Sequence, residues 1–566
     1  KQGFNGLITT NASNQSRYNS TLVMNYKPGK LNLYSTYGFR QDNRPRKMTD
    51  LRTIYDSVPT TYGQYRKSDA RPISHNVTAG ADYSINDKNV IGVSGTYFYM
   101  NFLRQENTSI ILHDQENKVT SDYSRDRLDK EYEYEKEISA SYEHQFEKED
   151  HAIQFEFNFA DHFEQEDNHY TQTYRTPYKP KTYDNTLIKQ FEKQTECIVE
   201  YVYPINEDSE LEAGYEWVTL KQNFDFHGEY LDTIQNVFIK DVEKSNRFNF
   251  TQNVHAIYAT YSQSIEDFNF LLGLRAEQAY ITSNLVTMDS IIQNNYFKVY
   301  PTIHLSYELD DNKELQLSYS KRVNRPEGDE LNPFPEYRDP RNIGAGNPNL
   351  KPEQIHSIEF GYQYKGKKIS VFPTIFYRYM YDGFAEISKY INDSTLLTTS
   401  ENLSTDQSAG LELVLTMQVK KILSLNLSGD AFYNQIDASN LGYSEKKSAF
   451  SYTAKLGANI NLTTSTVMQI NTNYRSTQLT PQGRYLPTFT LNAGMRQDIF
   501  KKKVSILLTV SDVFNTLRWT SEINTPVLSQ KITSKRTSQI FYLGFTYRFG
   551  KATKAPAEEL KFDDKM

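Results

Sequence analysis

Hydrophobic and polar residues alternate one by one along much of the chain. From Ala409 to Val419 every second residue is apolar, and mainly polar residues or glycine lie between them. The same two-residue period recurs in 297–307, 423–428 and 451–462. Successive side chains of a β-strand point to opposite faces, so each segment predicts a strand with one apolar and one polar face. A helix would need apolar residues three and four positions apart, a spacing that these segments lack.

Runs of this kind can be placed along the whole chain, and we predict about 22 strands. They lie near 3–11, 17–26, 30–40, 71–86, 88–104, 131–146, 150–166, 188–205, 208–226, 247–264, 267–283, 295–309, 312–322, 351–366, 367–381, 405–420, 421–437, 446–462, 465–477, 486–500, 502–512 and 538–549. Many are longer than the ~5–6 residues of an average strand in a soluble protein. Length therefore favours strands that cross a membrane.

The connections between these strands alternate between tight and long. Tight turns fall at 27–30, 86–88, 147–150, 206–209, 310–312, 365–367 and 463–465. Long polar segments fall at 41–70, 105–130, 167–187, 227–246, 323–350, 382–404 and 513–537. Short turns at one rim and long loops at the other are typical of outer-membrane barrels, in which the short turns are periplasmic.

The fold prediction is therefore all-β. Residues 1–549 form an about 22-stranded antiparallel transmembrane β-barrel with short periplasmic turns and long extracellular loops. Residues 550–566 are short and charged, and we expect a disordered periplasmic tail. A soluble all-β protein is the alternative, but a propeller would show a repeat of ~40–50 residues, which we do not find.

Composition agrees with a barrel once the alternation is known. Only 38% of residues are hydrophobic and the mean hydropathy is -0.69, yet the chain holds 43 tyrosines and 32 phenylalanines. A transmembrane strand needs only every second residue to be apolar, so its average hydropathy stays low. The net charge of -7 argues against a nucleic-acid partner, and the single cysteine, Cys197, argues against a cysteine-based metal site.

Several motifs resemble those of TonB-dependent receptors. Residues 320–326 read SKRVNRP, 331–334 read LNPF and 346–353 read GNPNLKPE, which is similar to the signature of that family. Residues 511–515, SDVFN, resemble its "DxFN" element, 541–549 resemble its aromatic terminal strand, and 3–9 resemble the junction between plug and barrel. The residues that carry the resemblance are Arg325, Pro326, Asn332, Pro333, Gly346, Asn347, Pro348, Leu350, Pro352, Glu353, Asp512, Phe514, Asn515 and Phe549.

The resemblance implies a receptor in the outer membrane of a Gram-negative bacterium. Such a receptor binds a scarce ligand, for example a chelated metal, a peptide or a glycan, and passes it through the lumen when TonB moves a plug domain. Its partners are outer-membrane lipid, the plug, and TonB through the plug. We expect the plug upstream in the precursor, a separate polypeptide being the alternative. No enzyme activity, cofactor or resident metal is implied. A passive pore, or a structural or adhesive barrel whose loops bind another protein, remain alternatives.

Two groups of residues are candidates for ligand contact. Tyr170, Tyr174, Tyr178 and Tyr183 could stack on a sugar or aromatic ligand, although aromatic loops are common on barrel rims. Arg325, Arg338 and Arg341 could bind an anion, but acidic residues share their loop, and a structural salt-bridge network is the more ordinary interpretation. Carboxylates and histidines in 161–169 could ligate a divalent metal, with a solvated strand end as the more ordinary alternative.

Overall fold

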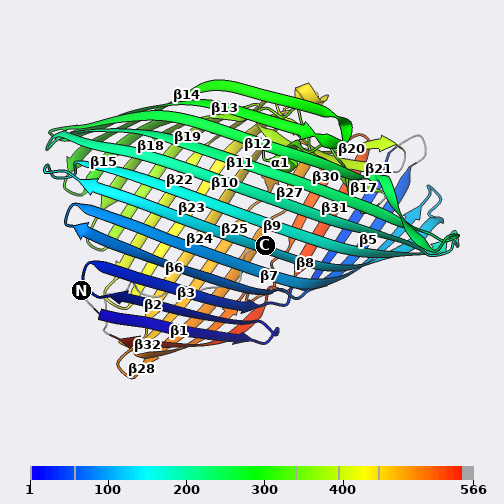
Figure 1. Ribbon diagram of the computed structural model, residues 1–566, viewed down its shortest axis with the longest axis horizontal. Helices are drawn as coiled ribbons and strands as arrows, with labels where there is room; N and C mark the ends of the chain where they lie inside the picture. Colours follow the sequence, from blue (N-terminus) through cyan, green and yellow to red (C-terminus); the bar gives the residue numbers. More distant parts are fainter. Residues whose placement is uncertain (1–2, 56–58, 340, 393–394, 444–445, 551–566) are drawn as a thin grey trace.

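The computed structural model describes the chain except for residues 1–2, 56–58, 340, 393–394, 444–445 and 551–566, and it describes 336–339 by their backbone alone. Strands dominate, and 22 of them close into one antiparallel barrel (Figure 1). The wall consists of β1 (Gly3–Ser13), β2 (Tyr18–Lys27), β3 (Leu31–Gln41), β6 (Ile73–Asn86), β7 (Asn89–His113), β8 (Val119–Gln145), β9 (Ala152–Thr176), β10 (Thr182–Asn206), β11 (Ser209–Asp232), β12 (Val237–Ile265), β13 (Phe268–Leu285), β14 (Ser290–Asp310), β15 (Lys313–Asn324), β18 (Glu353–Lys365), β19 (Ile369–Tyr381), β22 (Thr405–Val419), β23 (Leu423–Asp437), β24 (Lys447–Asn461), β25 (Thr466–Arg475), β28 (Thr488–Ile499), β29 (Val504–Ser511) and β32 (Ile540–Gly550).

The first and last strands close the ring. β1 pairs with β32 in antiparallel register from Asn5 opposite Gly550 to Ser13 opposite Tyr542. A closed ring leaves no strand edge with unpaired backbone groups, which is the condition for a sheet to stand in lipid. The predicted barrel of about 22 strands is confirmed. The predicted tail at 550–566 lies outside the described residues apart from Gly550.

Short turns lie at the rim that also holds both described chain ends. β2 and β3 are joined by 28–30, β6 and β7 by 87–88, and β10 and β11 by 207–208. This rim is periplasmic, because outer-membrane barrels carry their short turns on that side. No helix among the described residues is both long and apolar enough to cross a membrane.

The wall is much taller on one side than the sequence pattern predicts. Segments 105–130, 167–187 and 227–246, predicted as loops, are mostly strand: β7 continues to His113, β9 to Thr176 and β11 to Asp232. The hairpins project to the right in Figure 1. Above the membrane both faces of a strand meet water, so the apolar alternation is lost while backbone pairing continues. The pattern therefore marks only the part of each strand that lipid contacts.

Four further strands extend the wall beside these hairpins. β4 (Arg46–Ile54) and β5 (Thr60–Ala70) rise from the connection between β3 and β6, and β5 pairs with β7. β30 (Trp519–Asn524) and β31 (Leu528–Arg536) rise between β29 and β32, and β31 pairs with β4. β26 (Gln478–Leu479) and β27 (Gly483–Tyr485) join them through β30. The sheet above the membrane thus continues over the place where the chain ends meet.

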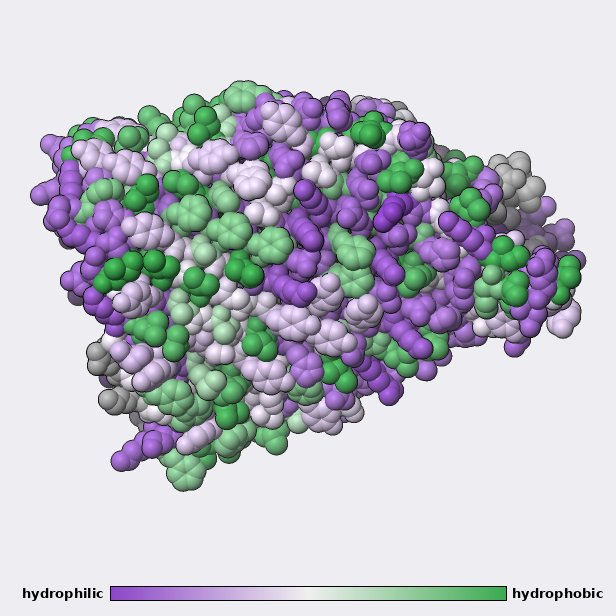
Figure 2. Space-filling model, viewed as in Figure 1, coloured by the Kyte–Doolittle hydropathy of each residue, from purple (hydrophilic) through white to green (hydrophobic). Residues whose placement is uncertain are grey.

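The outer surface of the wall is apolar in its periplasmic half. Val93, Ile138, Leu274, Ile375 and Phe545 all have exposed side chains, as lipid contact requires. Figure 2 shows apolar residues gathered over the wall near the short turns, with hydrophilic residues commoner towards the extracellular end. Tyrosine–histidine hydrogen bonds recur on this surface: Tyr37–His75 at 2.9 Å, Tyr215–His255 at 2.8 Å and Tyr319–His356 at 2.9 Å. Amphipathic rings of this kind favour the membrane–water interface.

Candidate functional site

The extracellular mouth is crossed by a small second sheet. Its strands are β16 (Glu336–Asp339), β17 (Asn342–Gly344), β20 (Phe384–Asn392) and β21 (Thr395–Asn402), and we call it the cross-mouth sheet. β16 and β17 belong to the connection from β15 to β18, which also holds the short helix α1 (Gly328–Leu331), and β20 and β21 belong to the connection from β19 to β22. The segments predicted as long loops at 323–350 and 382–404 therefore fold together.

An apolar cluster fixes the base of this assembly to the lumen wall. We call residues 320–353, which contain the three family motifs, the signature segment. Its Leu331, Phe334 and Leu350 are all nearly fully buried. They pack against apolar side chains of β12 and β13, namely Phe248, Phe250, Ile281 and Leu285. Because polar groups line most of the lumen, this apolar cluster fixes where the segment packs on the lumen wall.

The signature residues make the turns that this packing needs. A Cβ at Gly346 would lie 2.4 Å from the carbonyl oxygen of Glu330, so only glycine fits there. The Gly346 N–H donates to the Asn332 carbonyl at 2.7 Å, and the Asn347 N–H donates to that of Glu330 at 2.6 Å. Pro326 is buried, and Pro333, Pro348 and Pro352 are half-buried. The segment is thereby folded back on itself.

Asn347 and Glu353 then tie the segment to its neighbours. The Asn347 side-chain amide donates to the Ser400 carbonyl of β21 at 3.1 Å and to the Glu401 carboxylate at 3.0 Å. The buried Glu353 carboxylate accepts from the Asn324 side chain and from the Phe384 N–H, each at 2.8 Å. One carboxylate thus joins β15, β18 and the start of β20.

The cross-mouth sheet also reaches the far wall. The Asn342 side-chain amide donates to the Tyr62 hydroxyl at 2.9 Å, and its side-chain oxygen accepts from the Arg52 guanidinium. Arg52 in turn binds Asp50 and lies 4.2 Å above the ring of Tyr62. β4 and β5, which carry these residues, rise from the connection between β3 and β6, almost diametrically opposite β15 and β18 in the ring. The mouth is therefore bridged from wall to wall.

The second motif builds a tight corner after β29. Asp512 is 1% exposed, and its carboxylate accepts four hydrogen bonds. They come from the Thr516 N–H (3.0 Å) and hydroxyl (3.1 Å), the Leu517 N–H (2.9 Å) and the Ser538 hydroxyl (2.6 Å). Asn515 has φ 54°, a left-handed conformation that asparagine tolerates. Phe514 is 61% exposed and stacks on Phe489, and Phe549 packs on Phe4 where the ring closes.

The four candidate tyrosines do not converge. Tyr170 is buried on the lumen face of β9 with the Arg125 guanidinium 3.9 Å above its ring, and Tyr174 packs against Tyr123 on the same face. Tyr183 lies on the outward face of β10, and Tyr178 is 85% exposed between the two strands. As ligand contacts these residues stay a prediction, in which Tyr170 and Tyr174 face the lumen and Tyr183 does not.

The candidate arginines of the signature segment also separate. Arg325 is paired with Glu277 on β13 and donates to the Tyr296 hydroxyl at 2.7 Å, so its partners are on the wall rather than in its own loop. Arg341 is half-buried, and its carbonyl accepts from the Leu396 N–H of β21 at 2.9 Å. The side chain of Arg338 lies outside the described residues. Anion binding by these arginines stays a prediction.

A column of carboxylates faces the lumen on β8 and β9. Glu131 lies directly opposite Glu166, and Glu133 directly opposite Glu164. One oxygen of each of Asp129, Glu131 and Glu166 lies within 4.8 Å of the others. β8 crosses the membrane within about 10 residues of Gln145, so Asp129 and Glu131 stand above it. Burial and the Glu166 carboxylate raise the pKa of Glu131 to about 9, and burial raises that of Asp129 to about 6 although Arg127 opposes it.

This column contains part of the segment in which the sequence suggested a metal site. The structure retains Glu164 and Glu166 of 161–169 and adds acids from the preceding strand. His169 lies on the opposite, outward face and is hydrogen-bonded to Asn185 at 3.0 Å. Strand pairing, which sequence spacing did not reveal, brings the acids together.

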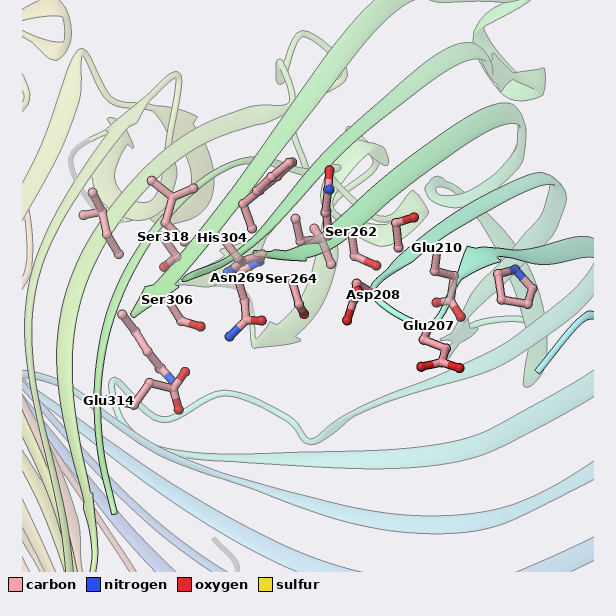
Figure 3. A pocket seen from close by; sticks show the side chains of 18 of the residues that line it. Glu207, Asp208, Glu210, Ser262, Ser264, Asn269, His304, Ser306, Glu314 and Ser318 are labelled. Carbon is pink, nitrogen blue, oxygen red and sulfur yellow. The ribbon is translucent and has the colours of Figure 1, made fainter. Parts of the chain in front are cut away.

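Two cavities in the described part of the lumen carry opposite charge. One, of about 980 Å³, lies near the periplasmic rim, and Figure 3 shows carboxylates of Glu207, Asp208, Glu210 and Glu314 along it. The other, of about 1100 Å³, lies inside the strands that meet at the ring closure and is lined by five arginines. Sequence reasoning missed this second site. Its one local signal is the stretch 40–46, RQDNRPR, which holds three of the arginines.

The chain is similar to known proteins in sequence pattern and in fold. A family model described as "Outer membrane protein beta-barrel family" matches residues 144–547. No curated protein matches the chain in sequence. The copper transporter OprC aligns over 97% of this chain and 81% of its own, with a TM-score of 0.64 and 11% identity. The ferric-catecholate import receptor Fiu from K12 E. coli aligns over 97% of this chain and 82% of its own, with a TM-score of 0.63 and 11% identity. The siderophore receptor PiuA from Acinetobacter baumannii aligns over 97% of this chain and 82% of its own, with a TM-score of 0.62 and 12% identity.

At such low identity these structures show a shared fold. The resemblance to TonB-dependent receptors, drawn from the motifs, is confirmed as a resemblance of barrels, and so is the outer-membrane location. The matched proteins are transporters and receptors, in line with the expectation that the chain is not an enzyme.

Proposed function

Because the chain belongs to the outer membrane protein beta-barrel family, we propose that it is the translocation barrel of a TonB-dependent receptor. The extracellular mouth binds a scarce ligand. The ligand then passes through the lumen when TonB, acting on a plug domain, opens a path. The plug is part of the precursor or a separate polypeptide.

The observation that carries this proposal is the bridged mouth. The signature segment is anchored in the lumen wall by its apolar cluster and contacts the far wall through Asn342. A sheet across the entrance would obstruct a general diffusion pore, whereas a receptor needs surfaces there that converge on a ligand. The polar, charged lumen below the sheet supports passage of a solvated molecule.

Two other functions fit a barrel of this size. A passive pore would leave a water-filled channel, and a 22-stranded barrel is otherwise normally filled by a plug. A structural or adhesive barrel would use the tall hairpins of β7 to β12 to bind another protein, and would transport nothing. The bridged mouth favours the receptor over both.

Single-channel recording in planar bilayers tests the proposal. The protein is isolated from the outer membrane in its natural form and compared with the 566-residue chain alone. A receptor is nearly silent in its natural form, because the lumen is filled, and the chain alone conducts. Steady large conductance from the natural form contradicts the receptor and favours the pore. Silence of both forms, with no nutrient whose uptake needs TonB, favours the adhesive barrel.

A further inference from the structure

The basic cavity is concentrated in one sector of the lumen. Arg17, Arg40, Arg44, Arg46 and Arg536 line it together with one carboxylate, Asp42. These six residues leave a formal excess of four positive charges. The whole chain carries -7, so the excess runs against the average of the protein.

The arginines stand at the level where the membrane-spanning strands end on the extracellular side, which is also the base of β4 and β31. Arg17 ends the turn from β1 to β2, Arg40 is near the end of β3, and Arg46 begins β4. Arg536 ends β31, directly opposite Arg46. A solute that enters from outside meets this sector before it reaches the periplasmic half of the lumen. An electrostatic field of one sign raises the local concentration of counter-ions.

Asp42 holds three of the arginines together. It is 3% exposed, and Arg17, Arg40 and Arg44 each place a guanidinium nitrogen 3.0 Å from its carboxylate. Burial raises the pKa of Asp42, but the hydrogen bond from Arg44 and the charges of the three arginines outweigh it and lower the pKa overall. The carboxylate therefore stays ionised, and three cations share one anion.

The remaining two arginines face each other across adjacent strands. Arg46 and Arg536 are both exposed to the cavity, and Arg46 donates to the Ser534 hydroxyl at 2.8 Å. Arg536 forms no ion pair within the described part of the chain. Like charges directly opposite each other repel across a sheet, and an anion bound between the two guanidinium groups would reduce that repulsion.

The rest of the lining suits a small molecule with polar and flat groups. Asn11, Asn19 and Asn76 offer side-chain amides, and Trp519 and Tyr542 offer rings. A cavity of about 1100 Å³ is slightly larger than the ~300–1,000 Å³ usual for small ligands. The planar guanidinium fork matches carboxylate and phosphate oxygens in particular.

We propose that this cavity binds a small molecule bearing two or more carboxylate or phosphate groups, as the entry site of the transported ligand. The inference deepens the receptor function proposed above by naming the chemical class of its ligand. Binding is measured without transport, so failure here leaves the receptor proposal standing.

Tryptophan fluorescence reads the cavity directly. The chain has two tryptophans, Trp217 on the outward face of β11 and Trp519 in the lining, so the Trp217→Phe variant reports on the cavity alone. The probes are pyrophosphate and the tricarboxylate tricarballylate at constant ionic strength, with uncharged maltose as a control. Millimolar pyrophosphate, tricarballylate or both change the Trp519 emission saturably, and maltose does not. Response to only one of the two anions identifies the ligand as phosphate-bearing or carboxylate-bearing.

Two matched double variants locate the binding. Arg46→Gln with Arg536→Gln removes the facing pair in the lumen and weakens binding by about tenfold or more, because charge-assisted hydrogen bonds are lost. Lys47→Gln with Lys535→Gln removes the same charge from the same strands on the outward face, where these lysines are also directly opposite and exposed. It leaves binding within about twofold, since screening by salt limits charges across the wall. Heat-modified gel mobility verifies that both variants are folded barrels.

Three results overturn the proposal. The first is no saturable response to either anion. The second is equal weakening by the two double variants, which reduces the effect to bulk charge. The third is binding of a polyglutamate peptide at the same arginines while both small anions fail, which makes the cavity a docking surface for polypeptide.

Discussion

Replacing Leu350 by alanine tests whether the apolar cluster holds the signature segment in place. The change removes three carbons from a side chain that is 2% exposed, which at ~0.8 kcal/mol per buried carbon costs about 2.4 kcal/mol. Four of its cluster neighbours lie on β12 and β13, which their ladders fix on both sides. The site collapses little, a cavity term adds to the loss, and we expect about 3–4 kcal/mol in total.

Hydrogen exchange measures this loss where it acts. The amides of Gly346 and Asn347 are bonded within the segment, so they exchange when it detaches. A loss of about 3 kcal/mol accelerates their exchange roughly 100-fold, since ~1.4 kcal/mol is a factor of ten. The thermal stability of the barrel ring changes little, because the ladders of the wall are untouched.

Two controls bracket the result. Leu350→Met keeps the volume and costs less than about 1.5 kcal/mol. Ile234→Ala truncates a side chain that is 94% exposed at the tip between β11 and β12, and it leaves exchange at 346–347 unchanged. If Leu350→Ala exchanges no faster than the wild type, the cluster does not hold the segment and the reasoning fails.

Three further outcomes are expected. Asp512→Ala leaves the Thr516, Leu517 and Ser538 donors without their acceptor, at a cost of ~1 kcal/mol or more each. It therefore lowers the melting temperature of the barrel, measured by heat-modified gel mobility, and Asp512→Asn gives a melting temperature between those of the wild type and Asp512→Ala. An unchanged melting temperature contradicts the role of the corner. Because the pKa of Glu131 is raised to about 9, the folded protein keeps a proton that the unfolded chain releases near pH 4.5, and the β8–β9 extension loses stability as pH rises between those values. We expect proteolysis of the extension to accelerate from pH 5 to pH 8. Glu131→Gln should remove this pH dependence of the proteolysis rate, and an unchanged pH dependence contradicts the role of Glu131. Asn342→Ala removes the contact with the far wall and speeds exchange in β17 while the ring melts as before; protected β17 amides would mean that other contacts bridge the mouth.

The membrane explains which strands the sequence could predict. Lipid requires an apolar residue at every second position, so strands such as β22 and β24 can be predicted from the alternation alone. The upper halves of β7 to β12 carry no such requirement. Residues 119–131, for example, are mostly polar on both faces although they pair along their length. Their strand character follows from tertiary pairing, which no local pattern records.

Which face each candidate site residue takes could not be predicted from the sequence, for a related reason. In a strand, a shift of one residue changes the face, and in a polar extension nothing in the sequence fixes that parity. Tyr170 and Tyr174 share the lumen face, while Tyr183 on the next strand faces outward. The motif residues could be recognised from the sequence, because Gly346 and Asp512 act through turns only a few residues long. The basic cavity was invisible because Arg17 and Arg536 come from opposite ends of the chain.

The seam between the two ends of the chain has a consequence for assembly. Asn5 and Gly550 become neighbours only when the last strand arrives, and contacts so distant in sequence form late. Asn11 and Gly544, which face each other across this seam, both line the basic cavity. The cavity therefore does not exist in a partly assembled sheet. A ligand that binds there favours the finished ring over every earlier state, so occupancy would act as a clasp on a freshly inserted barrel.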